Sequence, residues 1–183
     1  EQLPPAELNQ LVQTYFSSFL EIIRAHHGDV NETAGDGLMV IFQGGAAQDK
    51  RDLASRDHAV NSTRAAFSIR QKTLDLNELN RATLQPIALH MGINTGEALV
   101  GATKLGGAGA QRWTFTATGP VTNQAARFAG FAQGGEIIVG PKTAERIRGV
   151  FVLEALGPKS FKNVSEPIPV FRLIPPGVYE KIV

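Results

Sequence analysis

Apolar positions recur at helical spacing in two long stretches of the chain. In the first stretch they are Leu8, Leu11, Val12, Tyr15, Phe16, Phe19, Leu20, Ile22 and Ile23. Steps of three and four residues place these side chains on one face of a helix. Pro5 suits the first turn of this helix and Gly28 suits its end. The second stretch, 57–79, has the same kind of spacing, so we predict two long amphipathic helices.

Short apolar and β-branched runs predict strands around and between these helices. The predicted strands are 38–42, 87–94, 98–101, 113–118, 136–139, 151–153 and 168–173. Two shorter helices are expected over 121–131 and 142–147, a loop over 43–56 and a hairpin tip over 106–109. There is no internal repeat and no long linker, so 1–183 is expected to be a single domain. The mixture of helices with hairpin-joined strands favours an α+β fold with a mixed, mostly antiparallel sheet.

Composition narrows the function classes. The 183 residues are 43% hydrophobic and 19% charged, with a net charge of +1, and there is no cysteine. The absence of cysteine excludes disulfides and thiolate metal sites. Since there is neither a basic excess nor a basic stripe, a nucleic-acid partner is not expected. No apolar run reaches the length of a membrane span. We therefore expect a cytoplasmic location, with the cytosolic part of a membrane-anchored protein as the alternative.

Four segments, in this order, carry a family resemblance: residues 28–42 (GDVNETAGDGLMVIF), 91–97 (MGINTGE), 115–127 (FTATGPVTNQAAR) and 161–171 (FKNVSEPIPVF). Together they resemble the class III adenylate/guanylate cyclase catalytic domain. The resemblance implies a ferredoxin-like α/β sandwich, ATP or GTP as substrate, and two divalent cations, Mg²⁺ or Mn²⁺. It also implies a homodimer with active sites at the interface. An upstream sensor or membrane domain is compatible with it in the parent protein.

In this family the ribose 3′-hydroxyl attacks the α-phosphate, which gives a 3′,5′-cyclic nucleotide and pyrophosphate. The resemblance makes Asp36 a metal ligand, and a hard carboxylate oxygen suits Mg²⁺. The simpler interpretation of Asp36 with Gly37 is a tight turn. The resemblance makes Asn123 and Arg127 catalytic, and their spacing of four places them on one helix face. The alternatives are a local cap for Asn123 and a solvated arginine.

Three further positions match substrate-binding positions of the family. Glu32 stands where adenylate cyclases usually have Lys and guanylate cyclases have Glu. A carboxylate accepts hydrogen bonds from guanine N1–H and its N2 amine, so Glu32 favours GTP. The alternative is a base pocket that has drifted in a domain that no longer turns over nucleotide. Thr116 is the second base-reading position, and because Thr both donates and accepts it does not decide between the bases. Lys162 matches a phosphate-contacting Lys, with an ordinary exposed Lys as the alternative.

The sequence departs from the family pattern at its beginning. The family has a second metal carboxylate in a Phe-x-Asp-Ile-x-Gly-Phe-Thr-like strand before the first helix, and this chain contains no such pattern. Because the first residue is Glu1 and the family's first strand is not found, we expect a cyclase domain truncated at its N-terminal end. This segment alone is then expected to have little or no activity. The alternative function is a catalytically degenerate cyclase-homology domain that dimerises or binds nucleotide to regulate a neighbour.

Overall fold

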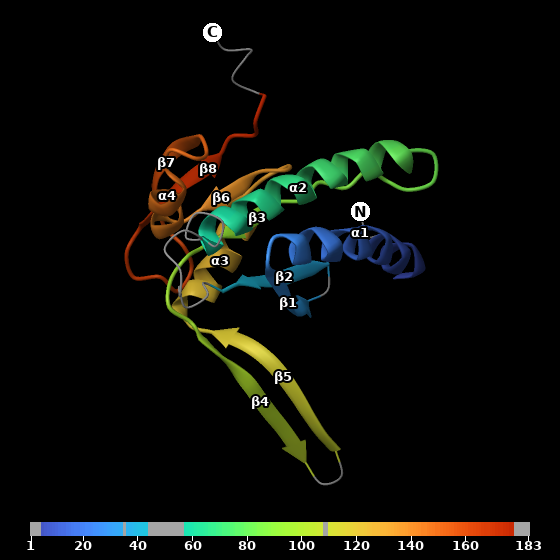
Figure 1. Cartoon of the computed structure of the whole chain (residues 1–183), viewed down its shortest axis with the longest axis horizontal. Coiled ribbons are helices and arrows are strands. Elements are labelled where there is room, and N and C mark those ends of the chain that lie inside the picture. The colour runs from blue at the N-terminus through green and yellow to red at the C-terminus, as the bar shows by residue number, and fades with distance from the viewer. Residues whose placement is uncertain (1–4, 35, 44–56, 108–109, 178–183) are drawn as a thin grey trace.

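The computed structural model describes residues 5–34, 36–43, 57–107 and 110–177 (Figure 1). The helices are α1 (Pro5–Ala25), α2 (His58–Leu79), α3 (Pro120–Phe131) and α4 (Pro141–Ile147). The strands are β1 (Gly28–Ala34), β2 (Gly37–Phe42), β3 (Met91–Ile93), β4 (Leu99–Gly107), β5 (Ala110–Thr118), β6 (Ile137–Val139), β7 (Leu153–Lys159) and β8 (Ile168–Leu173).

The described strands form one four-stranded sheet and two hairpins. The sheet has the order β3-β6-β8-β7, in which only β3 and β6 run parallel. β1 pairs with β2, and β4 pairs with β5, both antiparallel. Figure 1 shows the β4–β5 hairpin extending well away from the rest of the molecule. Helices combined with a mostly antiparallel strand arrangement confirm the expected α+β class.

Three hydrophobic clusters hold these elements together. Leu11, Tyr15, Phe19 and Ile23 recur every four residues on α1 and are buried against α2 and the β1–β2 hairpin. A second cluster joins α2 and α4 to one face of the four-stranded sheet. The third consists of Phe128, Ala132, Ile138 and Val170, with the ring of Phe161 packed against it. α3 is therefore fixed to the sheet by a completely buried Phe128.

Several predicted boundaries are wrong. The strand expected over 87–94 is regular only over β3, because β6 is the one described strand that pairs with it and the two share three residue pairs. The strand expected from Phe151 begins at Leu153. Gly106 and Gly107 continue β4 instead of forming the hairpin tip, because the β4–β5 register runs on to the Gly107–Ala110 pair. The rest of that tip, and residues 44–56 of the loop predicted over 43–56, lie outside the described residues.

Candidate functional site

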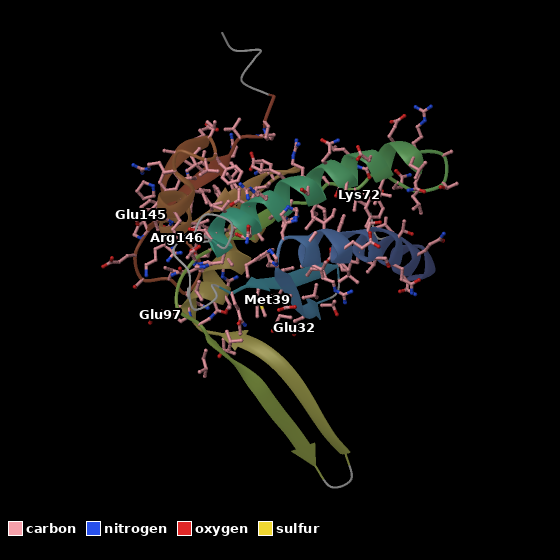
Figure 2. All side chains as sticks on the ribbon, in the orientation of Figure 1. Glu32, Met39, Lys72, Glu97, Glu145 and Arg146 are labelled. Atoms are coloured by element: carbon pink, nitrogen blue, oxygen red, sulfur yellow. The ribbon has the colours of Figure 1, made fainter. Side chains whose placement is uncertain are left out.

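The β1–β2 hairpin carries Glu32 and Asp36. Asp36 lies in the turn between the strands and is exposed. The expected turn at Asp36 is therefore present, and its exposed position is compatible with a ligand role. Glu32 is also exposed and pairs across the hairpin with Met39; Figure 2 labels both residues.

A β-bulge determines which way Glu32 points. Val30 pairs with Val40, and both pack against the α1 cluster. In a regular strand Glu32 would share the face of Val30, because side chains alternate. The register shifts between these two residues, so Asn31 is extra and Glu32 pairs with Met39. Cross-strand partners share a face, so Glu32 lies on the side opposite Val40. The bulge has no clear sequence signal, and sequence reasoning missed it.

α3 carries Asn123 and Arg127, both exposed and one helical turn apart. The helix begins after Gly119, whose φ of 141° suits glycine, and has Pro120 in its first turn. The Thr122 hydroxyl donates to the Gly119 carbonyl at 2.8 Å. Asn123 lies inside the helix and the N-cap residue is Gly119, so the interpretation of Asn123 as a cap is wrong. α3 thus presents an amide and a guanidinium together to the outside.

Lys162 lies in the loop between β7 and β8 and is exposed. The preceding residue, Phe161, places its ring against Phe128 at 5.4 Å and Phe131 at 6.0 Å between centroids. These edge-to-face contacts hold the loop against α3. Thr116 belongs to β5, where it pairs with Gly101. Its side chain lies outside the described part of the structure.

The predicted site residues fall into two groups. Glu32 and Asp36 share one hairpin, and β5, which carries Thr116, contacts β1. Asn123 and Arg127 share α3, and the Lys162 loop packs on that helix. Across the described ranges, no hydrogen bond or ion pair joins the first group to the second. Glu32 and Asp36 lie on one hairpin, Asn123 and Arg127 lie one turn apart on α3, and β5 contacts both β1 and α3. That these residues share a site stays a prediction.

The predicted cations can be compared with the donors that are present. Within the described residues there is no group of three or more His, Cys, Asp or Glu side chains able to hold a metal. Asp36 alone supplies one hard oxygen ligand, which fits an ion such as Mg²⁺ whose other ligands are phosphates and water. One carboxylate does not make a two-ion site. The number and type of cation remain predictions.

A family model described as the adenylate and guanylate cyclase catalytic domain matches residues 1–171. The chain is 23% identical over 173 residues to Adenylate cyclase 1 of Rhizobium meliloti (strain 1021), which is 93% of this chain and 24% of that protein. It is 24% identical over 153 residues to an adenylate cyclase of Mycobacterium bovis, which is 84% of this chain and 31% of that protein. The chain therefore spans less than a third of these relatives.

Solved structures show the same fold. The adenylyl cyclase CyaB from P. aeruginosa superposes with a TM-score of 0.78 at 24% identity, covering 94% of this chain and 85% of that one. The guanylyl cyclase Cya2 gives 0.79 at 25% identity, covering 94% and 83%. A non-canonical dimeric guanylyl cyclase domain from Blastocladiella emersonii gives a TM-score of 0.70 at 18% identity, covering 94% of this chain and 86% of that one. Separately, none of the described helices is long and apolar enough to cross a membrane.

Proposed function

Because this chain belongs to the family of adenylate and guanylate cyclase catalytic domains, we propose that it catalyses nucleotide cyclisation. The substrate is a purine nucleoside triphosphate, ATP or GTP. The ribose 3′-oxygen forms a bond to the α-phosphorus, and the bond from that phosphorus to the pyrophosphate oxygen breaks. The hydroxyl proton is released, and the products are the 3′,5′-cyclic monophosphate and pyrophosphate. The family match does not favour the degenerate regulatory alternative.

The observation that carries this proposal is the pair of exposed polar side chains on α3. Phe128 anchors the helix in the core, while Asn123 and Arg127 stand one turn apart on its exposed side. A guanidinium offers a planar fork of donors that matches phosphate oxygens. We assign Arg127 the role of stabilising the negative charge that develops on the transferring phosphate. Hydrogen-bond donors fixed in place there lower the activation barrier of the reaction. Asn123 orients the ribose.

The remaining predicted residues, from both groups, supply contacts for the polyphosphate and the base. We assign the Asp36 carboxylate as one oxygen ligand of a divalent cation. When bound, such a cation would neutralise negative charge on the triphosphate. Lys162 is assigned to the terminal phosphates, as a flexible point charge. Glu32 points away from the core at the bulge. We assign its carboxylate as the acceptor of hydrogen bonds from guanine N1–H and the N2 amine, and Thr116 as the second residue that contacts the base. A GTP preference is the expected result.

We further propose that the active sites form between two copies of the chain. One protomer presents Asp36 and Glu32 on a hairpin and Asn123 with Arg127 on α3, and no hydrogen bond or ion pair joins the two pairs among the described residues. A two-fold pair of protomers brings the hairpin group of one copy to the helix group of the other, twice.

Turnover by the full-length protein tests the function. GTP and ATP are supplied separately with Mn²⁺, and the cyclic product and pyrophosphate are measured. Arg127→Ala is expected to lower kcat by about 10²–10³-fold, because it removes charge stabilisation from the transition state. Arg64→Ala, an exposed arginine on α2, is the matched control and should retain wild-type kcat. Absence of cyclic product, or full activity in Arg127→Ala, would contradict the proposal, and a clear ATP preference would contradict the role given to Glu32.

A further inference from the structure

We propose that one face of residues 90–94, which include β3, positions α3. In this proposal Gly92 and Asn94 are positioning residues for Asn123 and Arg127. This inference rests on the proposed function, since it gives α3 a catalytic role. Residues 90, 92 and 94 alternate along extended chain, so their side chains share a face. All three meet α3, at successive points along the helix.

Gly92 marks the closest approach of strand and helix. A Cβ atom added at Gly92 would clash with the backbone carbonyl of Ala125 and the backbone nitrogen of Ala129, and it would lie 2.9 Å from the Phe128 Cβ. The first two obstacles are backbone atoms, which cannot rotate away as the end of a flexible side chain does. Any larger residue at position 92 therefore requires α3 to move relative to the sheet.

Asn94 fixes the N-terminal end of the same helix. Its Nδ2 donates to the Val121 carbonyl at 3.2 Å and to the Gln124 Oε1 at 2.9 Å. The space for this side chain is provided by Gly140, where a Cβ would collide with the Asn94 Oδ1. At the other end of the strand, the His90 Nδ1–H donates to the Ala129 carbonyl at 2.9 Å. The helix is thus held near both of its ends and at its middle.

The contacted face of α3 is not the catalytic face. The strand meets Val121, Gln124, Ala125, Phe128 and Ala129, which follow the three- and four-residue steps of one helical stripe. Asn123 and Arg127 lie outside this stripe and are exposed. A shift or rotation of α3 against β3 therefore moves both catalytic side chains together, while it leaves their chemistry intact. Misplacement of a catalytic group by about 1 Å can lower the rate by about 10²-fold.

Kinetics of Gly92→Ala in the full-length protein test this role. We expect kcat to fall by about 10–100-fold, with KM changed by less than about threefold, because the loss falls on the transition state and not on ground-state binding. Gly130→Ala is the matched control: it lies on α3 itself, and a Cβ there meets nothing within 4 Å. That variant should keep wild-type kcat. A Gly92→Ala enzyme that has lower thermal stability but wild-type kcat would overturn the inference.

A double-mutant cycle separates positioning from general damage. If Gly92→Ala acts by displacing Asn123 and Arg127 together, its effect on kcat should be smaller in an Arg127→Ala background, and the part that remains should be due to Asn123. Losses that multiply fully in the double variant would overturn the inference while leaving the proposed function standing. An Arg127→Ala variant with full activity would instead sink the proposed function and this inference with it.

Asn94→Ala is the second variant, and it decides the matter if Gly92→Ala does not fold. It removes both hydrogen bonds to α3 without adding an atom, so kcat should fall by about tenfold at nearly constant KM. The loss should again shrink in the Arg127→Ala background. An Asn94→Ala variant with wild-type kcat, or with losses that multiply with those of Arg127→Ala, would contradict the role given to this side chain.

Discussion

His58, the first residue of α2, is held in a setting that opposes its protonation. Burial is the larger cause that lowers the pKa of His58, and the positive charge of Arg146 lowers it further; Asp57 acts in the opposite direction. Asp57 is the N-cap of α2 and lies 3.9 Å from the Arg146 guanidinium. The positive end of the helix dipole also disfavours an imidazolium at this position. The folded protein therefore favours neutral His58.

The pH dependence of stability follows from this direction. A pKa lowered in the folded state gives stability that is complete above the usual histidine pKa of 6.5 and is lost as pH falls through and below it. We expect the wild-type free energy of unfolding to decrease between pH 7.5 and 5.5, and His58→Gln to reduce that decrease. Urea unfolding of both proteins at pH 7.5 and 5.5 measures the two decreases in the free energy of unfolding. An equal decrease in both proteins would show that His58 does not contribute.

At the residue scale, the ordered motifs predict candidate positions but not the directions in which their side chains point. Asp36, Asn123 and Arg127 are exposed, as a role at a ligand site requires. The direction of Glu32 depends on the extra residue at Asn31, and a bulge is set by pairing between two strands, which a single strand's sequence does not show. The close approach at Gly92 was missed for the same reason: the obstacle lies on α3, 33 and 37 positions further on, at Ala125 and Ala129.

At the element scale, Asn77 joins three segments through one side chain. The Tyr15 hydroxyl of α1 donates to the Asn77 Oδ1 at 2.7 Å, and the Ile87 backbone nitrogen donates to the same oxygen at 3.0 Å. The Asn77 Nδ2 donates in turn to the Ile87 carbonyl at 2.8 Å. This one amide of α2 therefore ties together α1 and the irregular segment that leads to β3.

Removal of this amide should destabilise the fold measurably. Asn77→Ala is expected to lower the free energy of unfolding by about 2–3 kcal/mol, because three partly buried hydrogen bonds are worth about 1 kcal/mol each. Tyr15→Phe is the matched control: it loses one of the three and should cost about 1 kcal/mol. Chemical denaturation of both variants measures the two values. A cost for Asn77→Ala no greater than that for Tyr15→Phe would contradict the bridging role.

Helices were predicted more accurately than strands because the two depend on different information. α1 and α2 form from bonds within their own segments, and their apolar spacing shows which face is buried. A strand is completed by a neighbour. Residues 87–90 alternate as a strand would, yet in the described structure β3 pairs only over Met91–Ile93. For the β4–β5 hairpin the predicted strand was too short and not too long. Pairing with β5 continues β4 to Gly107, further than its residue types predicted.

At the scale of the whole molecule, complementation tests the proposed two-copy site. Asp36→Ala and Arg127→Ala remove residues from different groups, so each variant alone should be nearly inactive. In an equal mixture, half of the dimers contain both variants, and one of the two sites in each has neither substitution. Activity should return to about a quarter of wild type. No recovery after verified exchange of protomers would contradict a site built from two copies.

The projecting β4–β5 hairpin has a consequence for how association can be observed. Its strands pair with each other from Leu99–Thr118 to Gly107–Ala110, while most of its length stands clear of the other elements (Figure 1). A two-stranded ribbon alone in water is only marginally stable. Its amide protons therefore exchange with deuterium through local opening, much faster than those of α1 or β6. Any surface that covers the ribbon slows this exchange, so the deuterium uptake of residues 99–118 is a gauge of assembly that requires neither nucleotide nor turnover.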